Sequence, residues 1–427
     1  MIVGGGFAGL AVAQELERAS KRCDLQTTVV NRENYTLFTP MLPEVVGGAV
    51  QGRDIVQPLR VSLPRTGFEL GEACEIDLAA RTVTVESPLT RRRKALAYDQ
   101  LILALGSTTS TFGLPGILEH TLPLKTMSDA LALRNRAIGA LEVAAGTRDL
   151  AERDRLLRFA IVGGGFTGVE ATGELLALVG SILRYYPTIE RPAVTVELIE
   201  SGDRLLAHLP PQFSKLAAHA LRERGVELQL GKQIASVDAQ GLEFSDHSRR
   251  ECATVVWSAG VEPDPFVNQL GVQLSKHGAV VVNPDFSVPG ARGVWALGDC
   301  AAVPKRGGGT YAPLAQNAVR EGPVLARNIL AKLAGRATAD FHYTSLGHMA
   351  SLGDRYGIAE LPGGHIVSGF PAWALWRGYY LSRLPGGYRK ARVALDWTLE
   401  LGFPRDTARL TLAGDGRDFE EVHATTR

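Results

Sequence analysis

The chain has 427 residues, a length that predicts roughly three folding units at about 150 residues per domain. Its 46 basic and 45 acidic residues balance, so it lacks the excess of Lys and Arg on which nucleic-acid affinity rests. A hydrophobic content of 45% is enough for a large core and excludes wholesale disorder. The four cysteines, Cys23, Cys74, Cys252 and Cys300, form no close pair, and the nine histidines show no ligand spacing. We therefore expect a reducing compartment and no metal site.

The amino terminus begins with a short apolar stretch and a glycine run. Only Met1, Ile2 and Val3 precede Gly4, whereas a buried strand usually carries about five residues. We therefore expect the strand to begin upstream of Met1, and we see no room for a signal peptide. No apolar run approaches the roughly 18 residues that span a bilayer, so an integral membrane protein is not expected.

One glycine fingerprint occurs twice. Segment 2–11 reads I-V-G-G-G-F-A-G-L-A, and segment 161–170 reads I-V-G-G-G-F-T-G-V-E, identical at seven of ten positions. Each is G-x-G-x-x-G between an apolar strand and a helical stretch, 10–19 and 169–183. The glycines allow a tight turn and close approach of a pyrophosphate, and the helix N-terminus offers free N–H groups. A single copy could be a glycine-rich turn, but two copies in this context predict two dinucleotide sites.

The second strand of each unit should end with a side chain that holds a ribose. In the first unit this position is Asn31, which can hydrogen-bond a hydroxyl but carries no charge. In the second unit it is Glu200, whose carboxylate accepts from a free 2′-OH and repels a 2′-phosphate. We therefore predict that NADH is preferred over NADPH, although Glu200 could also be a solvated strand end and Arg204 lies close by.

The order of the remaining strands assigns the two sites. Segment 293–299 is an apolar strand that ends in Gly298-Asp299 and resembles the second FAD signature of two-dinucleotide flavoproteins, in which the Asp holds the ribityl-pyrophosphate part. Segments 101–107 and 255–260 resemble the crossover strands between the domains. The predicted fold class is therefore α/β with two Rossmann-like dinucleotide-binding domains, in which an FAD domain (1–120 and 261–340) is interrupted by an NADH domain (121–260). A carboxyl-terminal region (341–427) follows.

Over essentially its whole length the chain resembles the type II, non-proton-pumping NADH:quinone oxidoreductases. Segment 34–43 resembles the family's loop beside the isoalloxazine, and 311–318 with Glu321-Gly322 resembles the lining of the flavin and quinone pocket. Segments 348–353 and 358–361 resemble its carboxyl-terminal signature.

The resemblance implies specific site residues. Glu170 and Gln316 are the expected catalytic residues. The expected contacts of non-covalent FAD are Gly4, Gly5, Gly6, Phe7, Ala8, Gly9, Asn31, Arg32, Thr39, Pro40, Ala73, Gly106, Asp299, Ala315 and Gln316. The expected contacts of NADH are Gly163, Gly165, Phe166, Thr167, Gly168, Glu170, Glu200 and Gly260.

The implied reaction passes a hydride from NADH to flavin N5 and then two electrons to a quinone. Gln316 would hydrogen-bond the flavin edge or a quinone carbonyl. Glu170, with a pKa raised by partial burial, would position groups or supply protons. Alternatively Glu170 is only an acid that favours the helix dipole. Two departures from the family pattern, Arg320 in place of a Gln and Tyr356 in place of a Lys, make the acceptor less certain than NADH oxidation.

The segment from Phe370 to Phe403 predicts contact with a membrane surface. It holds three of the five tryptophans, three tyrosines and five basic residues. Aromatic and basic residues without spanning length are typical of a segment lying in the headgroup layer. A dimer interface or an ordinary helix pair would show a similar composition, and we expect a homodimer as well. The expected location is peripheral, on the cytoplasmic face.

Three rival functions remain open. A soluble reductase that passes electrons to a ferredoxin would leave this tail unexplained. A sulfide:quinone reductase needs a cysteine pair at the flavin, and Cys300 has no partner near it in sequence. A flavin-bound, membrane-tethered interaction protein would have lost its acceptor site.

Overall fold

The computed structural model describes residues 1–21, 24–345 and 347–410, which form two compact units. The first unit comprises Met1–Leu37, Val56–Thr108 and Val261–Ser345, and the second comprises Phe38–Ile55, Thr109–Gly260 and, among the described residues, 347–410. The chain thus leaves the first unit after Leu37 and returns at Val56, and it leaves again after Thr108 and returns at Val261. Cys23 and the part of the expected carboxyl-terminal region beyond Leu410 lie outside the described residues.

The first unit is built on a five-stranded parallel sheet in the order β21-β9-β1-β2-β5. These strands are β1 (Ile2–Val3), β2 (Thr28–Asn31), β5 (Gly67–Leu70), β9 (Leu101–Leu103) and β21 (Val294–Ala296). Helices α1 (Phe7–Ala19) and α9 (Ala315–Leu333) pack closely where Gly322 faces Ala11. Glycine allows this approach because it has no Cβ, and a Cβ at Gly322 would lie 2.5 Å from the Cβ of Ala11. Strands β1, β9 and β21 are wholly apolar and buried, which suits the centre of a sheet covered on its faces.

Smaller elements complete the first unit. An antiparallel meander contains β6 (Glu72–Asp77), β7 (Thr82–Glu86) and β8 (Arg93–Ala97). The other elements are β3 (Tyr35–Leu37), β4 (Val56–Pro58), α3 (Leu59–Ser62), β10 (Ser107–Thr109), β19 (Val261–Pro263), η5 (Pro265–Gln269), β20 (Val280–Val281), η6 (Gly298–Cys300) and β22 (Ala301–Ala302).

The second unit repeats the plan with the parallel sheet β11-β18-β12-β13-β14. Its strands are β11 (Leu122–Pro123), β12 (Arg158–Val162), β13 (Thr195–Glu200), β14 (Val226–Leu230) and β18 (Thr254–Trp257). Its main helices are α2 (Leu42–Gly47), α5 (Met127–Gly146), α6 (Leu150–Leu156), α7 (Phe166–Ile182) and α8 (Pro211–Glu223). Shorter elements are η1 (Thr39–Met41), η2 (Gly52–Asp54), α4 (Ile117–His120), η3 (Leu183–Tyr185), η4 (Arg191–Ala193), β15 (Ile234–Asp238), β16 (Gly241–Phe244) and β17 (Arg249–Glu251).

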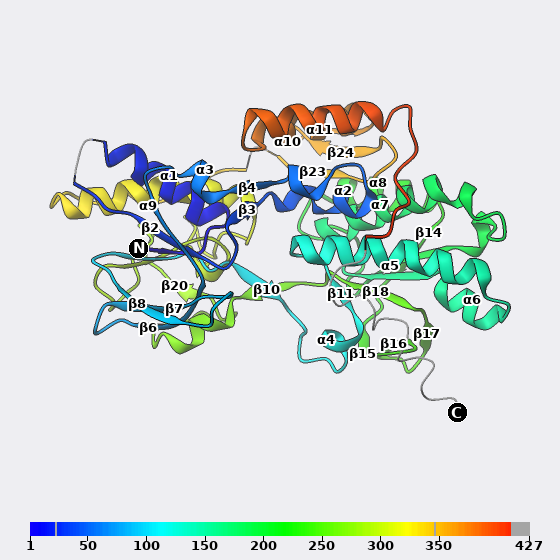
Figure 1. Cartoon of the computed structure of the whole chain (residues 1–427), viewed down its shortest axis with the longest axis horizontal. Coiled ribbons are helices and arrows are strands. Elements are labelled where there is room, and N and C mark those ends of the chain that lie inside the picture. Colours follow the sequence, from blue (N-terminus) through cyan, green and yellow to red (C-terminus); the bar gives the residue numbers. More distant parts are fainter. Residues whose placement is uncertain (22–23, 346, 411–427) are drawn as a thin grey trace. The chain divides into compact units, whose positions relative to one another are not determined.

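The carboxyl-terminal residues group with the second unit. They form the antiparallel sheet β23 (Met349–Ser351), β24 (Gly357–Glu360) and β25 (Ile366–Gly369), followed by α10 (Phe370–Arg383) and α11 (Gly387–Leu399). Figure 1 shows α10 and α11 beside β24 at the edge of this unit.

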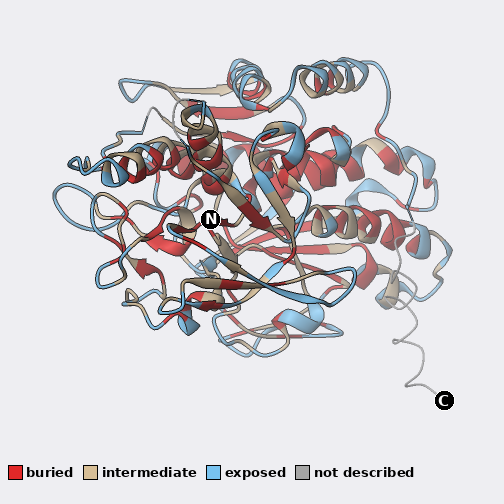
Figure 2. Cartoon of the chain, turned by 60° about the vertical axis from the view of Figure 1, so that its left-hand side comes forward, coloured by how far each residue is buried: buried red, intermediate tan, exposed pale blue. Residues whose placement is uncertain are grey.

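Helix α7 is the core helix of the second unit. Figure 2 colours the buried residues of the chain red. Thirteen of the 17 residues of α7 are buried. The segment Phe166–Tyr185 is also long and apolar enough to cross a membrane, although 78% of its most apolar window is buried in the protein. The sequence reading missed it because Gly, Thr and Glu interrupt the run of apolar residues. Burial of this kind is what a core helix of a soluble protein shows, so the segment is weak support for a membrane span.

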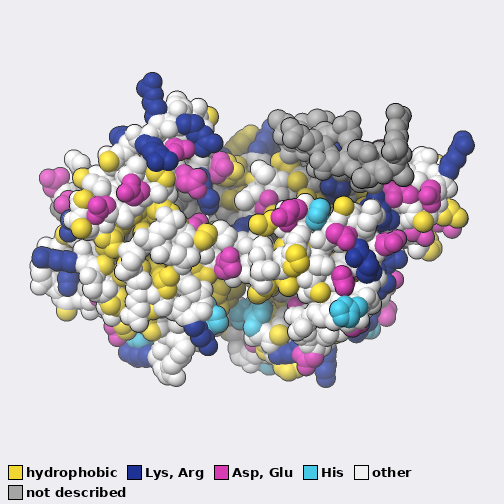
Figure 3. Space-filling view, turned by 90° about the horizontal axis from the view of Figure 1, so that it is seen from below, with side chains coloured by type: hydrophobic (Ala, Val, Ile, Leu, Met, Phe, Trp, Pro, Cys, Tyr) yellow, Lys and Arg dark blue, Asp and Glu magenta, His cyan; other side chains and the backbone are white. Residues whose placement is uncertain are grey.

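Charged side chains are mixed over the surface. On the face drawn in Figure 3, Lys and Arg alternate with Asp and Glu without gathering into one basic field. This distribution agrees with the near-zero net charge of +1.

Gly173 is expected to be indispensable for the packing of α7 against the carboxyl-terminal sheet. A Cβ at Gly173 would lie 2.0 Å from the carbonyl oxygen of Leu352, and a backbone atom cannot move aside cheaply. Gly173→Ala should therefore destabilise the protein by about 1–3 kcal/mol, measurable as a lowered midpoint of thermal unfolding. Gly146→Ala is the matched control, because a Cβ there meets nothing within 4 Å. Equal midpoints for the two variants would contradict this account.

Candidate functional site

The first glycine loop joins β1 to α1 in the geometry of a phosphate-binding turn. Gly4 has φ +107°, and a Cβ on Gly9 would lie 1.9 Å from the Gly4 carbonyl oxygen, so neither position accepts a side chain. Gly6, the N-cap of α1, has open space where a Cβ would stand. No side chain caps α1 and its first turn holds no acid, so its N–H groups and positive dipole are available to an anion.

Asn31, at the end of β2, holds this loop in place. Its Oδ1 accepts from the Gly5 amide at 2.8 Å, and its Nδ2 donates to the Glu33 carbonyl at 2.7 Å. The residue expected to hold a ribose therefore orders the turn on which a pyrophosphate would lie. Arg32 beside it is exposed and lies 3.5 Å from Glu72.

Asp299 lies in η6, directly after β21. Its Oδ2 accepts from the Ser107 hydroxyl at 2.7 Å, and the preceding Gly298 amide donates to buried Glu321 at 2.8 Å. Burial raises the pKa of Glu321 to about 7. The structure thus ties the second FAD signature to the crossover strand and to α9, all within the first unit.

The remaining expected FAD contacts fall at four places. Gly106 has φ +75° in the first unit, and Ala73 lies on β6. Ala315 and Gln316 begin α9. Thr39 and Pro40 form η1, which groups with the second unit.

The second glycine loop, between β12 and α7, repeats the geometry of the first. Gly163 has φ +111°, and a Cβ on Gly168 would lie 1.8 Å from the Gly163 carbonyl oxygen. Gly165 is the open N-cap, again without a side-chain cap and without an acid in the first turn. Because the same backbone turn occurs twice, both loops can receive a pyrophosphate.

Glu200 occupies the position that corresponds to Asn31 and makes the corresponding contact. Its Oε2 accepts from the Gly164 amide at 2.6 Å, and its Oε1 accepts from the Gly202 amide at 2.7 Å. Glu200 is therefore held by the backbone on both sides rather than being a freely solvated strand end. The fixed carboxylate places a negative charge beside the loop.

Aromatic rings gather at the start of α7. The Phe166 ring lies 5.3 Å from the His208 ring and 6.2 Å from the His348 ring. Burial lowers the pKa of both histidines, which favours their neutral forms. Thr167 is exposed at the same helix end. Gly260 lies where the chain leaves the second unit. A Cβ at this position would lie 2.9 Å from the Phe112 ring.

Glu170 is a buried acid on the second turn of α7. Its Oε1 accepts from the Ser351 amide at 3.0 Å and from the Trp376 indole N–H at 3.1 Å. Burial raises its pKa to about 8, although these two donors oppose the shift. The side chain is directed into the carboxyl-terminal sheet and α10, so it does not merely complement the helix dipole.

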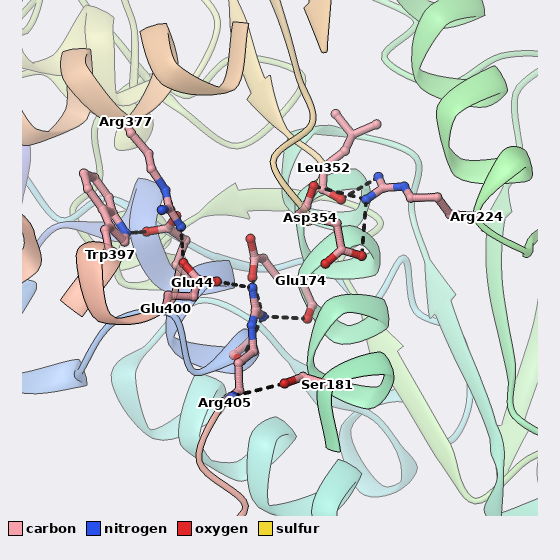
Figure 4. Close-up of polar contacts among 12 residues, drawn as sticks. Glu44, Glu174, Ser181, Arg224, Leu352, Asp354, Arg377, Trp397, Glu400 and Arg405 are labelled. Carbon is pink, nitrogen blue, oxygen red and sulfur yellow. Dashed lines mark hydrogen bonds and ion pairs between the residues drawn. The ribbon is translucent and has the colours of Figure 1, made fainter. Parts of the chain in front are cut away.

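Glu174, one turn after Glu170 on α7, belongs to a buried ionic network that Figure 4 shows in close-up. Arg405 contacts Glu174 at 2.8 Å and Glu400 at 2.7 Å. Arg377 contacts Glu400 at 2.5 Å and Glu44 at 3.4 Å. Three carboxyl groups thus share two guanidinium groups. Burial raises the pKa of Glu44 to about 8, so this third carboxyl is largely protonated at neutral pH and the network is close to neutral.

Both departures from the family pattern contact aromatic or basic neighbours. The Arg320 guanidinium carbon lies 4.3 Å from the Tyr343 ring centre, and its Nη1 donates to the Gln316 carbonyl at 2.8 Å. The Tyr343 hydroxyl in turn contacts Gln316 Oε1 at 3.4 Å. The Arg320 guanidinium is therefore held over the Tyr343 ring by these contacts and is not a freely solvated charge. Tyr356 lies 5.8 Å from the guanidinium carbon of Arg224.

Sequence reasoning missed the ionic network and the anchoring role of Arg224. Arg224 donates to the Leu352 carbonyl at 2.6 Å and to the Gly353 carbonyl at 3.1 Å. A signal for the network was present, because Glu170 and Glu174 are the only charged residues in α7 and stand one turn apart. Two acids in an otherwise apolar helix require buried partners.

Comparisons with known proteins point to one family. Residues 1–322 match the model of the pyridine nucleotide-disulphide oxidoreductases, and residues 345–406 match the NDH2 C-terminal domain. The chain is similar to the type II NADH:quinone oxidoreductase Ndh of Mycobacterium tuberculosis, with 34% identity over 93% of this chain and 87% of that protein. It is also 30% identical to the mitochondrial internal alternative NAD(P)H-ubiquinone oxidoreductase A1 of Arabidopsis thaliana, over 96% of this chain and 85% of the relative.

Among solved structures, Plasmodium falciparum NDH2 in complex with NADH has the same fold. The TM-score is 0.86 at 18% identity, with 95% of this chain and 99% of that chain covered.

Because Glu170 is protonated in the folded protein at neutral pH, we expect the free energy of unfolding to fall as the pH rises. A carboxyl whose ordinary pKa is 4.5 and whose pKa in the folded protein is about 8 binds its proton more tightly when folded. Between these values each pH unit should therefore cost on the order of 1.4 kcal/mol of unfolding free energy. Glu170→Gln keeps an acceptor for Ser351 and Trp376 and has no proton to lose. Its unfolding midpoint should fall less than that of the wild type between pH 5.5 and pH 8.

Glu119→Gln, at an exposed position on α4, is the control for this pH series. It should follow the wild type. A Glu170→Gln profile parallel to that of the wild type would show that Glu170 is ionised in the folded protein.

Proposed function

Because the chain belongs to the pyridine nucleotide-disulphide oxidoreductases and, within them, to the type II NADH:quinone oxidoreductases, we propose that it oxidises NADH with FAD and reduces a membrane quinone. Overall, NADH, one proton and a quinone give NAD⁺ and a quinol, without proton pumping. The observation that carries the proposal is the pair of matching glycine loops, each held by a side chain at the end of the following strand.

FAD belongs on the first unit and NADH on the second. The open N-terminus of α1, the turn held by Asn31, and Asp299 with Ser107 fit the pyrophosphate and ribityl parts of FAD. When bound, FAD accepts a hydride from NADH and passes the electrons to the quinone. The protein's contribution is to orient both nucleotides and to place charge where it is useful. Gln316, expected to reach the flavin edge or a quinone carbonyl, keeps its amide N–H₂ to donate while its oxygen lies near Tyr343.

Glu170 is proposed to hold a proton for quinol formation. Its carboxyl is buried, is oriented by Ser351 and Trp376, and has a pKa near 8, so it is largely protonated at neutral pH. A carboxylic acid of this pKa can donate a proton and recover it from solution near the working pH.

Two rival enzymes fit less well. Burial raises the pKa of the Cys300 thiol to about 12, and Cys74, Cys252 and Cys300 are all free. Such a thiol is a poor nucleophile, which argues against sulfide chemistry at this position. A soluble reductase for ferredoxin is disfavoured by the match of residues 345–406 to the NDH2 C-terminal domain.

Membrane contact is proposed through the outward faces of α10 and α11. Nine of the eighteen exposed large hydrophobic side chains in the described residues fall within positions 370–410. On α10 the exposed positions are apolar or small up to Ser382, and they include Leu375 and Tyr379. On α11 they include Tyr388 and Leu395. An unpartnered apolar face with basic residues beside it suits a helix pair lying in the headgroup layer.

The finer assignments follow as proposals. The carboxyl-terminal region from residue 341 serves membrane association and homodimer formation, and the protein is peripheral on the cytoplasmic face. The boundaries 1–120, 121–260 and 261–340 remain the proposed functional division. The compact units support it only in that the chain crosses between them near Thr108 and Gly260.

Steady-state oxidation of NADH by FAD-loaded protein with a short-chain quinone tests the activity. We expect fast turnover with NADH and weak turnover with NADPH, because the fixed Glu200 carboxylate repels a 2′-phosphate. Bleaching of the flavin by NADH without quinone turnover would refute the quinone assignment.

Glu200→Gln should narrow the preference for NADH over NADPH by roughly tenfold in kcat/KM. Glutamine removes the charge but can still accept from the Gly164 amide, so the loop keeps one of its anchors. If Glu200→Gln leaves the ratio of kcat/KM for NADH to kcat/KM for NADPH unchanged, Glu200 lies outside the ribose site.

Leu375→Glu combined with Leu395→Glu should release the protein from lipid vesicles in co-sedimentation. Each substitution places a charge where an apolar side chain would enter the interface, so we expect at least roughly tenfold weaker binding. Turnover of a soluble quinone should persist. The matched control is Leu118→Glu with Leu150→Glu, at leucines 78% and 72% exposed outside the tail. Equal loss in both pairs would contradict the assigned membrane face.

A further inference from the structure

A polar cavity of about 290 Å³ lies within the second unit. Its walls come from α7, the η4 turn, the turn after β23, α10 and the segment after α11. This volume is far more than the ~10–15 Å³ that a single water needs, so the cavity can receive a group as large as a substituted phosphate.

The charged residues that line the cavity do not balance. Four arginines face three carboxyl groups, which belong to Glu174, Asp354 and Glu400. Arg377 and Arg405, both less than one-tenth exposed, engage Glu174 and Glu400 at 2.5–2.8 Å. Asp354 has a further cation 4.0 Å away in Arg224. The carboxyl groups of the cavity are therefore already paired.

Two of the four arginines at the cavity, Arg191 and Arg355, have no carboxylate partner among the described residues. Among the described residues Arg191 has no ion-pair partner, and its guanidinium lies beside Gly180 of α7. Arg355 makes one long contact, donating to the Leu401 carbonyl at 3.4 Å. Guanidinium groups present paired N–H donors that match the oxygens of a phosphate.

We propose that this cavity is an anion site that binds a phosphate group through Arg191 and Arg355. The same chemistry occurs in the headgroup of an anionic phospholipid and in a free phosphate ester. Leu401 and Phe403, which line the cavity, are 54% and 68% exposed and offer an apolar approach suited to a lipid. The lipid source rests on the membrane contact proposed above, whereas the anion site itself does not.

The test compares three forms of the FAD-loaded full chain in binding assays. They are the wild type, Arg191→Ala/Arg355→Ala, and the charge-conserving Arg191→Lys/Arg355→Lys. Binding of glycerol 3-phosphate is measured by calorimetry. Co-sedimentation is measured with phosphatidylcholine vesicles and with mixed phosphatidylcholine and phosphatidylglycerol vesicles at constant salt. Arg148→Ala/Lys215→Ala removes the same charge at exposed positions of this unit and is the matched control.

For a lipid headgroup, the alanine pair should lose roughly thirtyfold of the preference for phosphatidylglycerol, with binding to phosphatidylcholine unchanged. The lysine pair should lose at least about threefold, because an ammonium group lacks the paired donors of a guanidinium. For a free phosphate, the wild type should bind glycerol 3-phosphate and the alanine pair should not. If the lysine pair matches the wild type in both assays, or if the control loses as much as the alanine pair, the site is overturned.

These readouts are independent of turnover. Failure of quinone reduction would refute the proposed activity and leave the binding results standing.

Discussion

The burial of α7 is the constraint on which the second unit depends. A helix without a solvated face must satisfy every polar group it carries inside the protein. Its N-terminus faces the glycine loop, Glu170 meets β23 and α10, and Glu174 meets Arg405 from the segment after α11. The carboxyl-terminal region therefore completes the hydrogen bonding of the nucleotide-binding helix. This explains why it groups with the second unit rather than standing alone.

The two glycine loops have the same backbone turn but differ in the charge of the side chain that anchors them. In each unit a side chain at the end of the second strand accepts from the amide of the middle glycine, which fixes the turn. The neutral amide of Asn31 does this without placing a charge beside its loop. The carboxylate of Glu200 makes the same contact and adds a negative charge beside its own loop. The anchoring contact is thus common to both sites, and the charge is where they differ.

Much of this arrangement could be predicted from the sequence, because glycine spacing and strand periodicity are local. The loops at Gly4 and Gly163 and the strand ends at Asn31 and Glu200 follow from residue type and short-range order. The raised pKa of Glu170, which the family resemblance implied, does not, because it depends on burial against Ser351 and Trp376, 181 and 206 positions away. The partners of Glu174 do not, because Arg405 lies 231 positions away and its contact depends on tertiary packing. The apolar outer faces of α10 and α11 were only suggested by composition. Which side of each helix is exposed depends on the packing of Trp376 and Trp397 inward.

The long-range contacts of Arg405 have a consequence for biosynthesis. Its guanidinium donates to the Gly47 carbonyl, 358 residues earlier, and to the Glu174 side chain. During translation, α7 emerges well before the arginine that pairs with its buried Glu174. The nascent second unit must therefore keep this carboxyl group protonated or hydrated until the tail arrives. Contacts between residues so far apart in sequence form late and slowly. We therefore expect the second unit to complete its folding after translation ends.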